Sequence, residues 1–300
     1  MHFETSNSIL QTIDHPLLKE HNVTLFVKRD DLIHPEVSGN KWRKLKYNVQ
    51  QFEVMRNESI LTFGGAYSNH LLATASACAQ LNIPCIGIVR GEELNPQSNT
   101  LLARCAELGM HLHFVTREEY ALRDMSEYFE ELKGQFPNCY IIPEGGANYY
   151  GMIGCQELVK ELPDFDHLFV AQGTAATSAG VLLGLRGAQR LGVVPAIKSF
   201  DAKGEMTRLY RKAGLDDETI EELFDMMDIY PDAHFGGYAK TTDELMSFMD
   251  FCRTTLDLRL DKVYTAKAFY ALWNQVAEGA LNDSTVIFLH TGGLGSHSEQ

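Results

Sequence analysis

The sequence predicts an α/β protein in which parallel sheets carry helices on both faces. Short apolar runs alternate with helical patterns through nearly all of its 300 residues. Several of these runs end in a polar loop that contains glycine and leads into a helix. Parallel strands need long crossover connections, which are usually helices, so this alternation is typical of parallel sheets. The length suits one large domain or two closely associated domains.

Each element follows from the spacing of its apolar residues. Runs bounded by glycine or proline predict buried strands, and recurrences such as Trp42, Leu45 and Val49 predict helices. In the first half we expect strands at 23–27, 59–63, 84–89, 111–115 and 140–142, and helices at 40–56, 68–81, 97–108 and 117–133. In the second half we expect strands at 167–171, 195–200 and 285–289, and helices at 151–161, 178–191, 205–213, 219–227, 241–256 and 266–280.

Composition excludes some classes of function. The net charge of −14 disfavours binding to nucleic acid or to an anionic membrane surface. None of the six cysteines forms a C-x-x-C pair, and no Cys/His cluster has zinc spacing, so no metal site is predicted and the thiols are expected to be buried and reduced. Because the sequence shows no signal-peptide pattern and no apolar segment of ~20 residues, we expect a cytoplasmic protein.

Four glycine-bearing loops, at Gly64, Gly145, Gly173 and Gly292, follow predicted strands. In open α/β sheets ligands bind at the carboxyl ends of strands, so these loops are candidates to converge on one ligand. The loop from Gln172 to Gly180 has the features of a phosphate cradle, with backbone N–H groups at a helix start and the hydroxyls of Thr174, Thr177 and Ser178. It matches neither G-x-x-x-x-G-K-[ST] nor G-x-G-x-x-G, and a capped helix without a ligand is the alternative.

Lys41 is the strongest candidate for chemistry. It follows a Ser-Gly-Asn turn between a predicted strand and a predicted helix, and Lys44 lies one helical turn later. A lysine aimed from such a turn can form an imine with a carbonyl group, and repulsion from a second lysine lowers its pKa. The alternative is a solvated basic face, since Lys28, Arg29, Arg43 and Lys46 are nearby.

Two further stretches carry polar groups of the kind that a binding site uses. Ser68 and Asn69 cap a predicted helix or clamp a ligand ring, and the adjacent His70 is more simply explained as a structural histidine. Tyr238 follows two glycines, whereas Tyr264 precedes a predicted helix. Core packing is the ordinary role of either tyrosine, although the glycines favour an exposed loop at Tyr238.

Taken together and in this order, these stretches resemble the family of pyridoxal-phosphate (PLP) enzymes that contains D-cysteine desulfhydrase and 1-aminocyclopropane-1-carboxylate (ACC) deaminase. The resemblance runs from about Val23 to Ser296. Its most specific parts are Lys28-Arg-Asp-Asp-Leu32 with Ser38-Gly-Asn-Lys41, Gly64-Gly-x-x-Ser-Asn-His70, Val263-Tyr-Thr-x-Lys267 and His290-Thr-Gly-Gly293.

The resemblance implies a type II PLP fold with two three-layer α/β/α domains, mainly parallel sheets and the cofactor between the domains, usually as a homodimer. We expect residues 1–48 with 147–300 to form the large PLP-binding domain and residues 49–146 to form the small one. It also implies a set of site residues. Lys41 falls on the imine-forming lysine, Asn69 on the residue that binds the ring 3-hydroxyl, and Tyr264 on the ring-packing tyrosine.

The remaining implied positions are assigned in the same way. The phosphate site falls on Gly173, Thr174, Ala175, Ala176 and Thr177, and Thr265 and Thr291 complete the cofactor contacts. Substrate contacts fall on Lys44, Ser68, Asn69, His70 and Tyr238, and catalytic roles on Lys41, Ser68, Tyr238 and Tyr264.

The expected activity is that of a lyase on a small D-amino acid, with D-cysteine giving pyruvate, sulfide and ammonia. Lys41 is expected to remove the Cα proton, and Ser68 with backbone N–H groups to hold the carboxylate. ACC deaminases look to have glutamate where this chain has Thr265, so ACC deamination to 2-oxobutanoate is the alternative activity. A PLP-binding protein without turnover and a nucleotide-binding protein using the Gly173 loop are the rivals from other classes.

The sequence departs from the family pattern in several places. Ala175 and Ala176 stand where glycines are common, Leu71 and Leu72 where arginine is often found, and Ala266 where glycine is usual. The sequence also ends soon after Gly295, sooner than the family pattern. These departures bear on the substrate more than on the fold.

Overall fold

The computed structural model describes residues 4–37 and 39–293. Ser38 and the Gly295–Ser296 end of the resemblance therefore lie outside the described residues. Within these ranges no helix has both the length and the apolar character needed to cross a membrane. The same ranges contain no group of three or more His, Cys, Asp or Glu side chains placed to hold a metal ion.

The larger of two sheets has six strands in the order β1-β2-β10-β7-β8-β9. Only the β1–β2 pair is antiparallel, and the other neighbours run parallel. The strands are β1 (Leu10–Ile13), β2 (Thr24–Lys28), β7 (His167–Gln172), β8 (Arg190–Pro195), β9 (Met227–Ile229) and β10 (Thr285–Leu289).

Helices cover both faces of this sheet because its central strands are apolar on both sides. In β7, Leu168 and Val170 face one hydrophobic core, and Phe169 and Ala171 face the other. The first core is covered by α7 (Tyr149–Gln156), α8 (Ala176–Gly184), α9 (Ala202–Lys212) and α10 (Asp217–Asp225). The second is covered by α1 (Pro16–Glu20), α11 (Asp243–Thr255) and α12 (Thr265–Ala277).

The smaller sheet has four parallel strands in the order β5-β4-β3-β6. They are β3 (Ser59–Gly65), β4 (Cys85–Arg90), β5 (Met110–Val115) and β6 (Cys139–Ile142). One face packs on α2 (Asn40–Met55), α3 (Asn69–Leu81) and α4 (Thr100–Glu107), and the other on α5 (Arg117–Tyr120) and α6 (Ser126–Gln135). Short 3₁₀ turns are η1 (Asp30–Leu32), η2 (Glu144–Gly146) and η3 (Glu157–Glu161).

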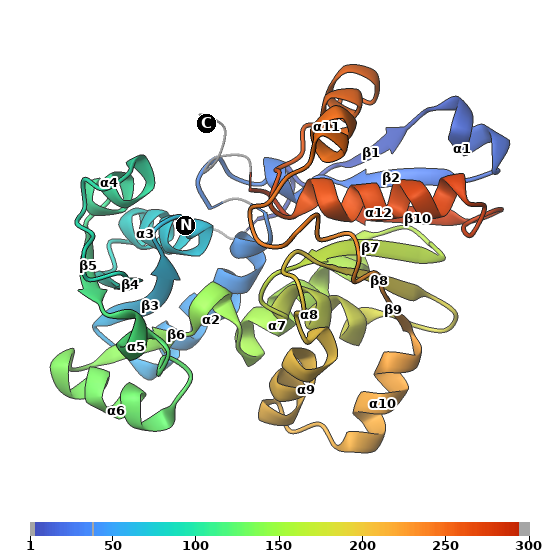
Figure 1. Ribbon diagram of the computed structural model, residues 1–300. Helices are drawn as coiled ribbons and strands as arrows, with labels where there is room; N and C mark the ends of the chain where they lie inside the picture. Colours follow the sequence, from blue (N-terminus) through green and yellow to red (C-terminus); the bar gives the residue numbers. More distant parts are fainter. Residues whose placement is uncertain (1–3, 38, 294–300) are drawn as a thin grey trace.

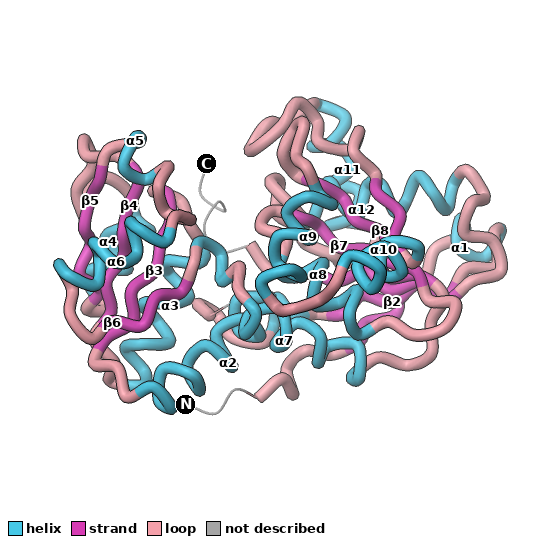
Figure 2. Tube along the Cα trace, turned by 90° about the horizontal axis from the view of Figure 1, so that it is seen from below, coloured by secondary structure: helices cyan, strands magenta, loops and turns pink. Residues whose placement is uncertain are grey.

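Helix α2 lies between the two sheets (Figures 1 and 2). Its apolar side joins the core of the smaller sheet, and its backbone packs directly on α7. A Cβ atom on Gly154 would lie 2.0 Å from the carbonyl oxygen of Arg43, so only glycine permits this approach. The predicted boundary between residues 48 and 49 falls inside α2, and the division into domains at that point stays a prediction.

Several predicted element boundaries are wrong. The strand expected at 195–200 lies instead at Arg190–Pro195, and the helix expected at 178–191 ends at Gly184. The helix ends because Leu185 is extended and Gly187 has φ +62°, which frees the apolar run after Arg190 to form β8. The helix expected at 117–133 is two helices, and the one expected at 151–161 becomes 3₁₀ after Gln156. The sequence prediction missed β1, α1 and β9, which are too short to show a period.

Candidate active site

Lys41 lies in the first turn of α2, and close backbone contact fixes where that turn begins. Gly39 has φ +63°, and a Cβ atom there would lie 1.9 Å from the carbonyl oxygen of Thr291. The Asn40 amide N–H donates to the same oxygen at 3.3 Å. Glycine at position 39 thus lets the start of α2 lie directly against the loop after β10, which fixes the position of the helix turn that carries Lys41.

Lys44 lies one turn further along and is 2% exposed. Its Nζ atom donates to the carbonyl oxygen of Gly145 at 3.0 Å and to Oγ1 of Thr174 at 3.4 Å. Burial lowers the pKa of Lys44. The sequence placed this lysine on the substrate side, whereas its amine contacts the loop predicted to bind phosphate.

That loop runs from Gly173 to Thr177 and leads into α8. The first N–H groups of a helix have no partner within it, so the start of α8 presents donors to an anion. Asn40 Nδ2 donates to Thr177 Oγ1 at 2.7 Å, while the buried Asn40 Oδ1 atom has no partner among the described residues. Ala175 has φ −62° and ψ −10°, a conformation open to any L-residue, so alanine fits where glycine is common.

The three residues predicted to clamp a ligand lie together at the start of α3. Ser68 is the N-cap, and its Oγ atom accepts from the Leu71 amide at 3.3 Å. The Asn69 side chain is half-buried and makes no hydrogen bond to any described residue. Ser68 therefore keeps its hydroxyl proton, and Asn69 its whole amide, for a ligand.

His70 is buried, and its neighbours determine which ring nitrogen carries the proton. The Thr62 hydroxyl donates to the carbonyl oxygen of Ile142 at 2.8 Å, so Thr62 Oγ1 must accept from His70 Nε2 at 2.9 Å. His70 Nδ1 is then an acceptor, and it has no partner among the described residues. Burial and then the charges of Lys44 and Lys41 lower the pKa of His70 to about 3, so the ring is neutral.

Tyr264 closes another side of the site. A Cβ atom on Gly173 would lie 2.9 Å from the Tyr264 ring, so glycine lets the ring pack on the phosphate-loop backbone. The ring of Tyr238 stands 6.2 Å from that of Tyr264 at 68°, and Tyr238 is 48% exposed. Burial, followed by the nearby Tyr238, raises the pKa of Tyr264 well above its ordinary value.

Thr265 is fully buried, and Asp261 engages its hydroxyl. Thr265 Oγ1 donates to Asp261 Oδ2 at 2.6 Å and accepts from the Asp261 amide at 2.8 Å. The same carboxylate accepts from the amides of Val263, Tyr264 and Thr265. Asp261, which the sequence prediction missed, thus holds the turn that presents Tyr264. An aspartate just before a helix start was the available signal.

These contacts define what we call the lysine site: Lys41, Lys44, Ser68 to His70, Gly173 to Thr177, Tyr264 and Thr291. Lys41 itself makes no hydrogen bond or ion pair with any described residue and is half-buried. Burial, then the charge of Lys44, lower its pKa to about 7, although Asp261 and Cys155 act in the opposite direction. A large share of the Lys41 amine is therefore unprotonated and nucleophilic near neutral pH.

Comparison with known proteins identifies the family. Residues 10–292 match the family described as pyridoxal-phosphate dependent enzyme. This chain belongs to that family. The match confirms the predicted cofactor, pyridoxal phosphate. The protein is therefore a PLP-dependent enzyme.

Relatives narrow the family further. A Pyrococcus abyssi protein with a provisional ACC deaminase name is 32% identical over 292 residues, covering 92% of this chain and 86% of that protein. The bifunctional mitochondrial D-cysteine desulfhydrase/ACC deaminase of Arabidopsis thaliana is 31% identical over 304 residues, covering 90% of this chain and 72% of that one. A crystal structure of an ACC deaminase homologue has 27% identity and a TM-score of 0.82, covering 99% of this chain and 92% of that one. The predicted family and its type II fold are confirmed.

Proposed function

We propose that this enzyme is a lyase or deaminase of small amino acids, with D-cysteine as the preferred substrate and ACC as the alternative. The observation that carries the proposal is the buried pair of lysines: Lys41 has no partner among the described residues and a pKa lowered to about 7, and Lys44 contacts Thr174 in the loop suited to phosphate. The names of the relatives support both substrates.

The residues of the lysine site fit the cofactor. We propose that Lys41 anchors it, and that Lys44 with the α8 N-terminus neutralises its phosphate, because Lys44 Nζ already touches Thr174. The Tyr264 ring, seated against Gly173, would pack on the cofactor ring, and Asn69 would bind its 3-hydroxyl. Thr291 and Thr265 would complete the contacts, Thr265 as a buried partner of Asp261.

Each substrate-side residue has a definite task. When bound, pyridoxal phosphate accepts the electron pair left at the substrate α-carbon. With D-cysteine as the substrate, Lys41 Nζ removes the α-proton, which ACC lacks. With either substrate, the Ser68 hydroxyl and the first amides of α3 hold the carboxylate. The Tyr238 and Tyr264 rings lie 6.2 Å apart between centroids, and we propose that one of the two assists proton transfer. His70 offers a lone pair at Nδ1, and so accepts a hydrogen bond from the ligand.

The substrate test compares sulfide release from D-cysteine and L-cysteine with 2-oxobutanoate formation from ACC. We expect sulfide from D-cysteine, none after Ser68→Ala, and slower release after Tyr238→Phe. Activity on ACC but not on D-cysteine would reverse the order of the two substrates. Bound cofactor with no product from any of the three would favour a PLP-binding protein without turnover.

We also propose a cytoplasmic homodimer, as the family resemblance implies, in which residues 1–48 with 147–300 form one domain and 49–146 the other. Sedimentation equilibrium at micromolar concentration tests the assembly, with twice the mass of the 33.7 kDa chain expected. A single-chain mass would contradict it.

A further inference from the structure

Lys267 is a buried cation that the proposed chemistry does not use. It lies in α12, is fully buried, and makes no ion pair with any described residue. Its Nζ atom donates to three backbone carbonyl oxygens, those of Gly237 at 2.7 Å, His234 at 2.8 Å and Ala196 at 3.5 Å. An ammonium has three N–H donors, so every one of them is used to fix backbone.

Two of these carbonyls belong to the loop that carries Tyr238. The backbone there is unfavourable by itself, with φ +49° at Phe235 and +54° at Ala239, flanking φ +92° and +117° at Gly236 and Gly237. Non-glycine residues at such angles cost energy that neighbouring contacts must offset. The charged hydrogen bonds from Lys267 reach the loop one residue before Tyr238.

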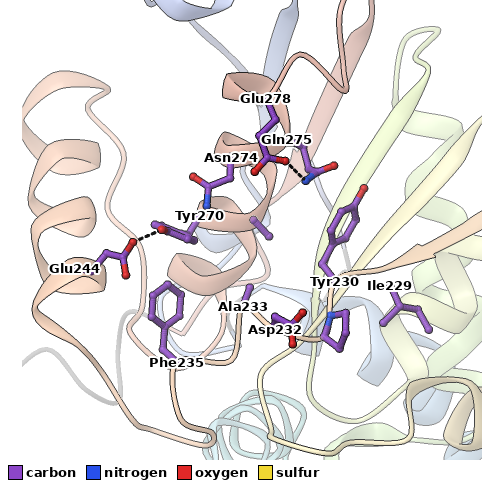
Figure 3. Close-up of a pocket in the computed structure, with 12 residues that line it drawn as sticks. Ile229, Tyr230, Asp232, Ala233, Phe235, Glu244, Tyr270, Asn274, Gln275 and Glu278 are labelled. Carbon is purple, nitrogen blue, oxygen red and sulfur yellow. Dashed lines mark hydrogen bonds between the residues drawn. The ribbon is translucent and has the colours of Figure 1, made fainter.

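The loop also packs on the core through apolar side chains, but part of it borders a cavity. Between the loop and α12 lies a cavity of about 620 Å³, lined by Tyr230 to Ala233, Phe235, Tyr270 and Asn274 among others (Figure 3). Phe235 contacts the edge of the Tyr270 ring at a centroid distance of 4.9 Å. Lys267 precedes Tyr270 by about one helical turn, and its ammonium holds the backbone on both sides of Phe235, at His234 and Gly237.

We propose that Lys267 is a positioning residue for Tyr238: its ammonium holds the loop from residue 234 to 237 so that the Tyr238 ring stands beside Tyr264. The inference rests on the proposed catalytic role of Tyr238, which stands beside Tyr264 of the lysine site. It assigns a task to the last residue of the Val263-Tyr-Thr-x-Lys267 motif, which the proposed reaction leaves without one.

A double-mutant cycle in the cofactor-loaded enzyme tests the link to Tyr238. Lys267→Met, Tyr238→Phe and their combination are compared by kcat and KM, with Lys240→Met as the matched control because Lys240 is an exposed lysine of the same loop. If Lys267 acts through Tyr238, the double variant is no slower than the slower single variant, within about twofold. Multiplication of the two losses would overturn the proposal.

Limited proteolysis supplies a readout that does not depend on activity. We expect Lys267→Met to speed cleavage between residues 231 and 240 at least tenfold, with no change in Tyr238→Phe or Lys240→Met. Lys267→Gln is made in parallel because it keeps a donor if methionine prevents folding, and partial protection is expected. Unchanged cleavage in both Lys267 variants would overturn the proposal, whereas failure of the wild type to bind pyridoxal phosphate would overturn the proposed function and leave this cleavage result interpretable.

Discussion

Three basic residues at the start of α2 lie in two opposite kinds of surroundings. Arg43 donates to both oxygens of Asp30, at 2.6 and 2.8 Å, and to both oxygens of Glu161, at 2.7 and 2.9 Å. Lys44, the next residue, is equally buried but contacts only neutral oxygens, and Lys41 has no partner among the described residues. One side of the helix start is neutralised by carboxylates, and the other is left cationic.

This difference gives Arg43 a role in stability and Lys41 a role in reactivity. Carboxylates outweigh the burial of Arg43 and raise its pKa, so its charge is permanent. Without such partners, burial lowers the pKa of Lys41 to about 7, which makes a nucleophile. A cationic side without anions is also what a phosphate and a substrate carboxylate need. The Arg43 network stabilises the fold, while Lys44 offers an unpaired charge to the ligand and Lys41 a partly unprotonated amine.

Removing Arg43 should have the largest effect on stability. Arg43→Met leaves the carboxylate of Asp30 buried without its main partner, so we expect a loss of about 3–5 kcal/mol in the free energy of unfolding. Urea denaturation measures it. Arg253→Met removes an exposed arginine whose one ion pair among the described residues is with Asp250, and should change stability by less than about 0.5 kcal/mol. Equal losses of stability in the two variants would show that the buried Arg43 network stabilises the fold no more than an exposed ion pair does.

The pH dependence of folding should report the same network. Burial alone would raise the pKa of Glu161, but hydrogen bonds and charge from Arg43, then Lys28, lower it to about 2. Because the folded pKa lies below the unfolded value, this stabilisation is complete above about pH 4.5 and is lost as pH falls toward 2. It amounts to about 3 kcal/mol. Glu161→Gln should flatten unfolding curves measured across that window, and an unchanged slope would contradict the assignment.

Replacing Lys44 should affect cofactor binding but not lower folding stability, in contrast to replacing Arg43. Lys44→Met removes an unpaired buried charge, so stability should hold or rise, while affinity for pyridoxal phosphate should fall by about 10–100-fold through loss of one charged hydrogen bond. Equilibrium dialysis of the apoprotein measures the affinity. If Lys44→Met lost as much stability as Arg43→Met and kept its affinity for the cofactor, Lys44 would be a structural residue and not a ligand-binding one.

The titration of Lys41 should give the smallest effect. Below about pH 7 its unprotonated fraction falls about tenfold per pH unit, so the rate of covalent cofactor attachment to apoprotein should fall equally. Lys44→Met removes a charge that lowers the pKa of Lys41, and should move the midpoint up by about half a unit to one unit. Asp261→Asn should move it down. Stopped-flow absorbance measures these midpoints, and the same midpoint in all three proteins would exclude this electrostatic coupling.

The sequence predicted the layers and the family well because both rest on local signals. Strand and helix periods and the four motifs are readable one segment at a time, and the comparisons confirm fold, family and cofactor. The start of β8 was missed because the end of α8 depends on the angles of Leu185 and Gly187, which apolar spacing does not reveal.

Contacts between residues far apart in the sequence could not be predicted from such local signals. The contact of Lys44 with Thr174 joins residues 130 apart, and the hydroxyl of Thr265 is taken by Asp261, which no motif had singled out. Predicted roles of individual site residues therefore stay predictions until variants are measured. For Ala175 and Ala176 the structure explains a departure that the sequence left unexplained. Both alanines adopt backbone conformations that do not require glycine.

The position at which the cofactor attaches tests the assignment of Lys41. Apoprotein is loaded with pyridoxal phosphate, reduced with borohydride and digested, and the modified peptide is located by mass spectrometry. The wild type should carry the cofactor on Lys41, and Lys41→Ala should carry none, while Lys46→Ala, which removes an ion-paired lysine of the same helix, should behave as wild type. Attachment at Lys44 or Lys267, or an unchanged yield in Lys41→Ala, would contradict the assignment of Lys41 as the lysine that anchors the cofactor.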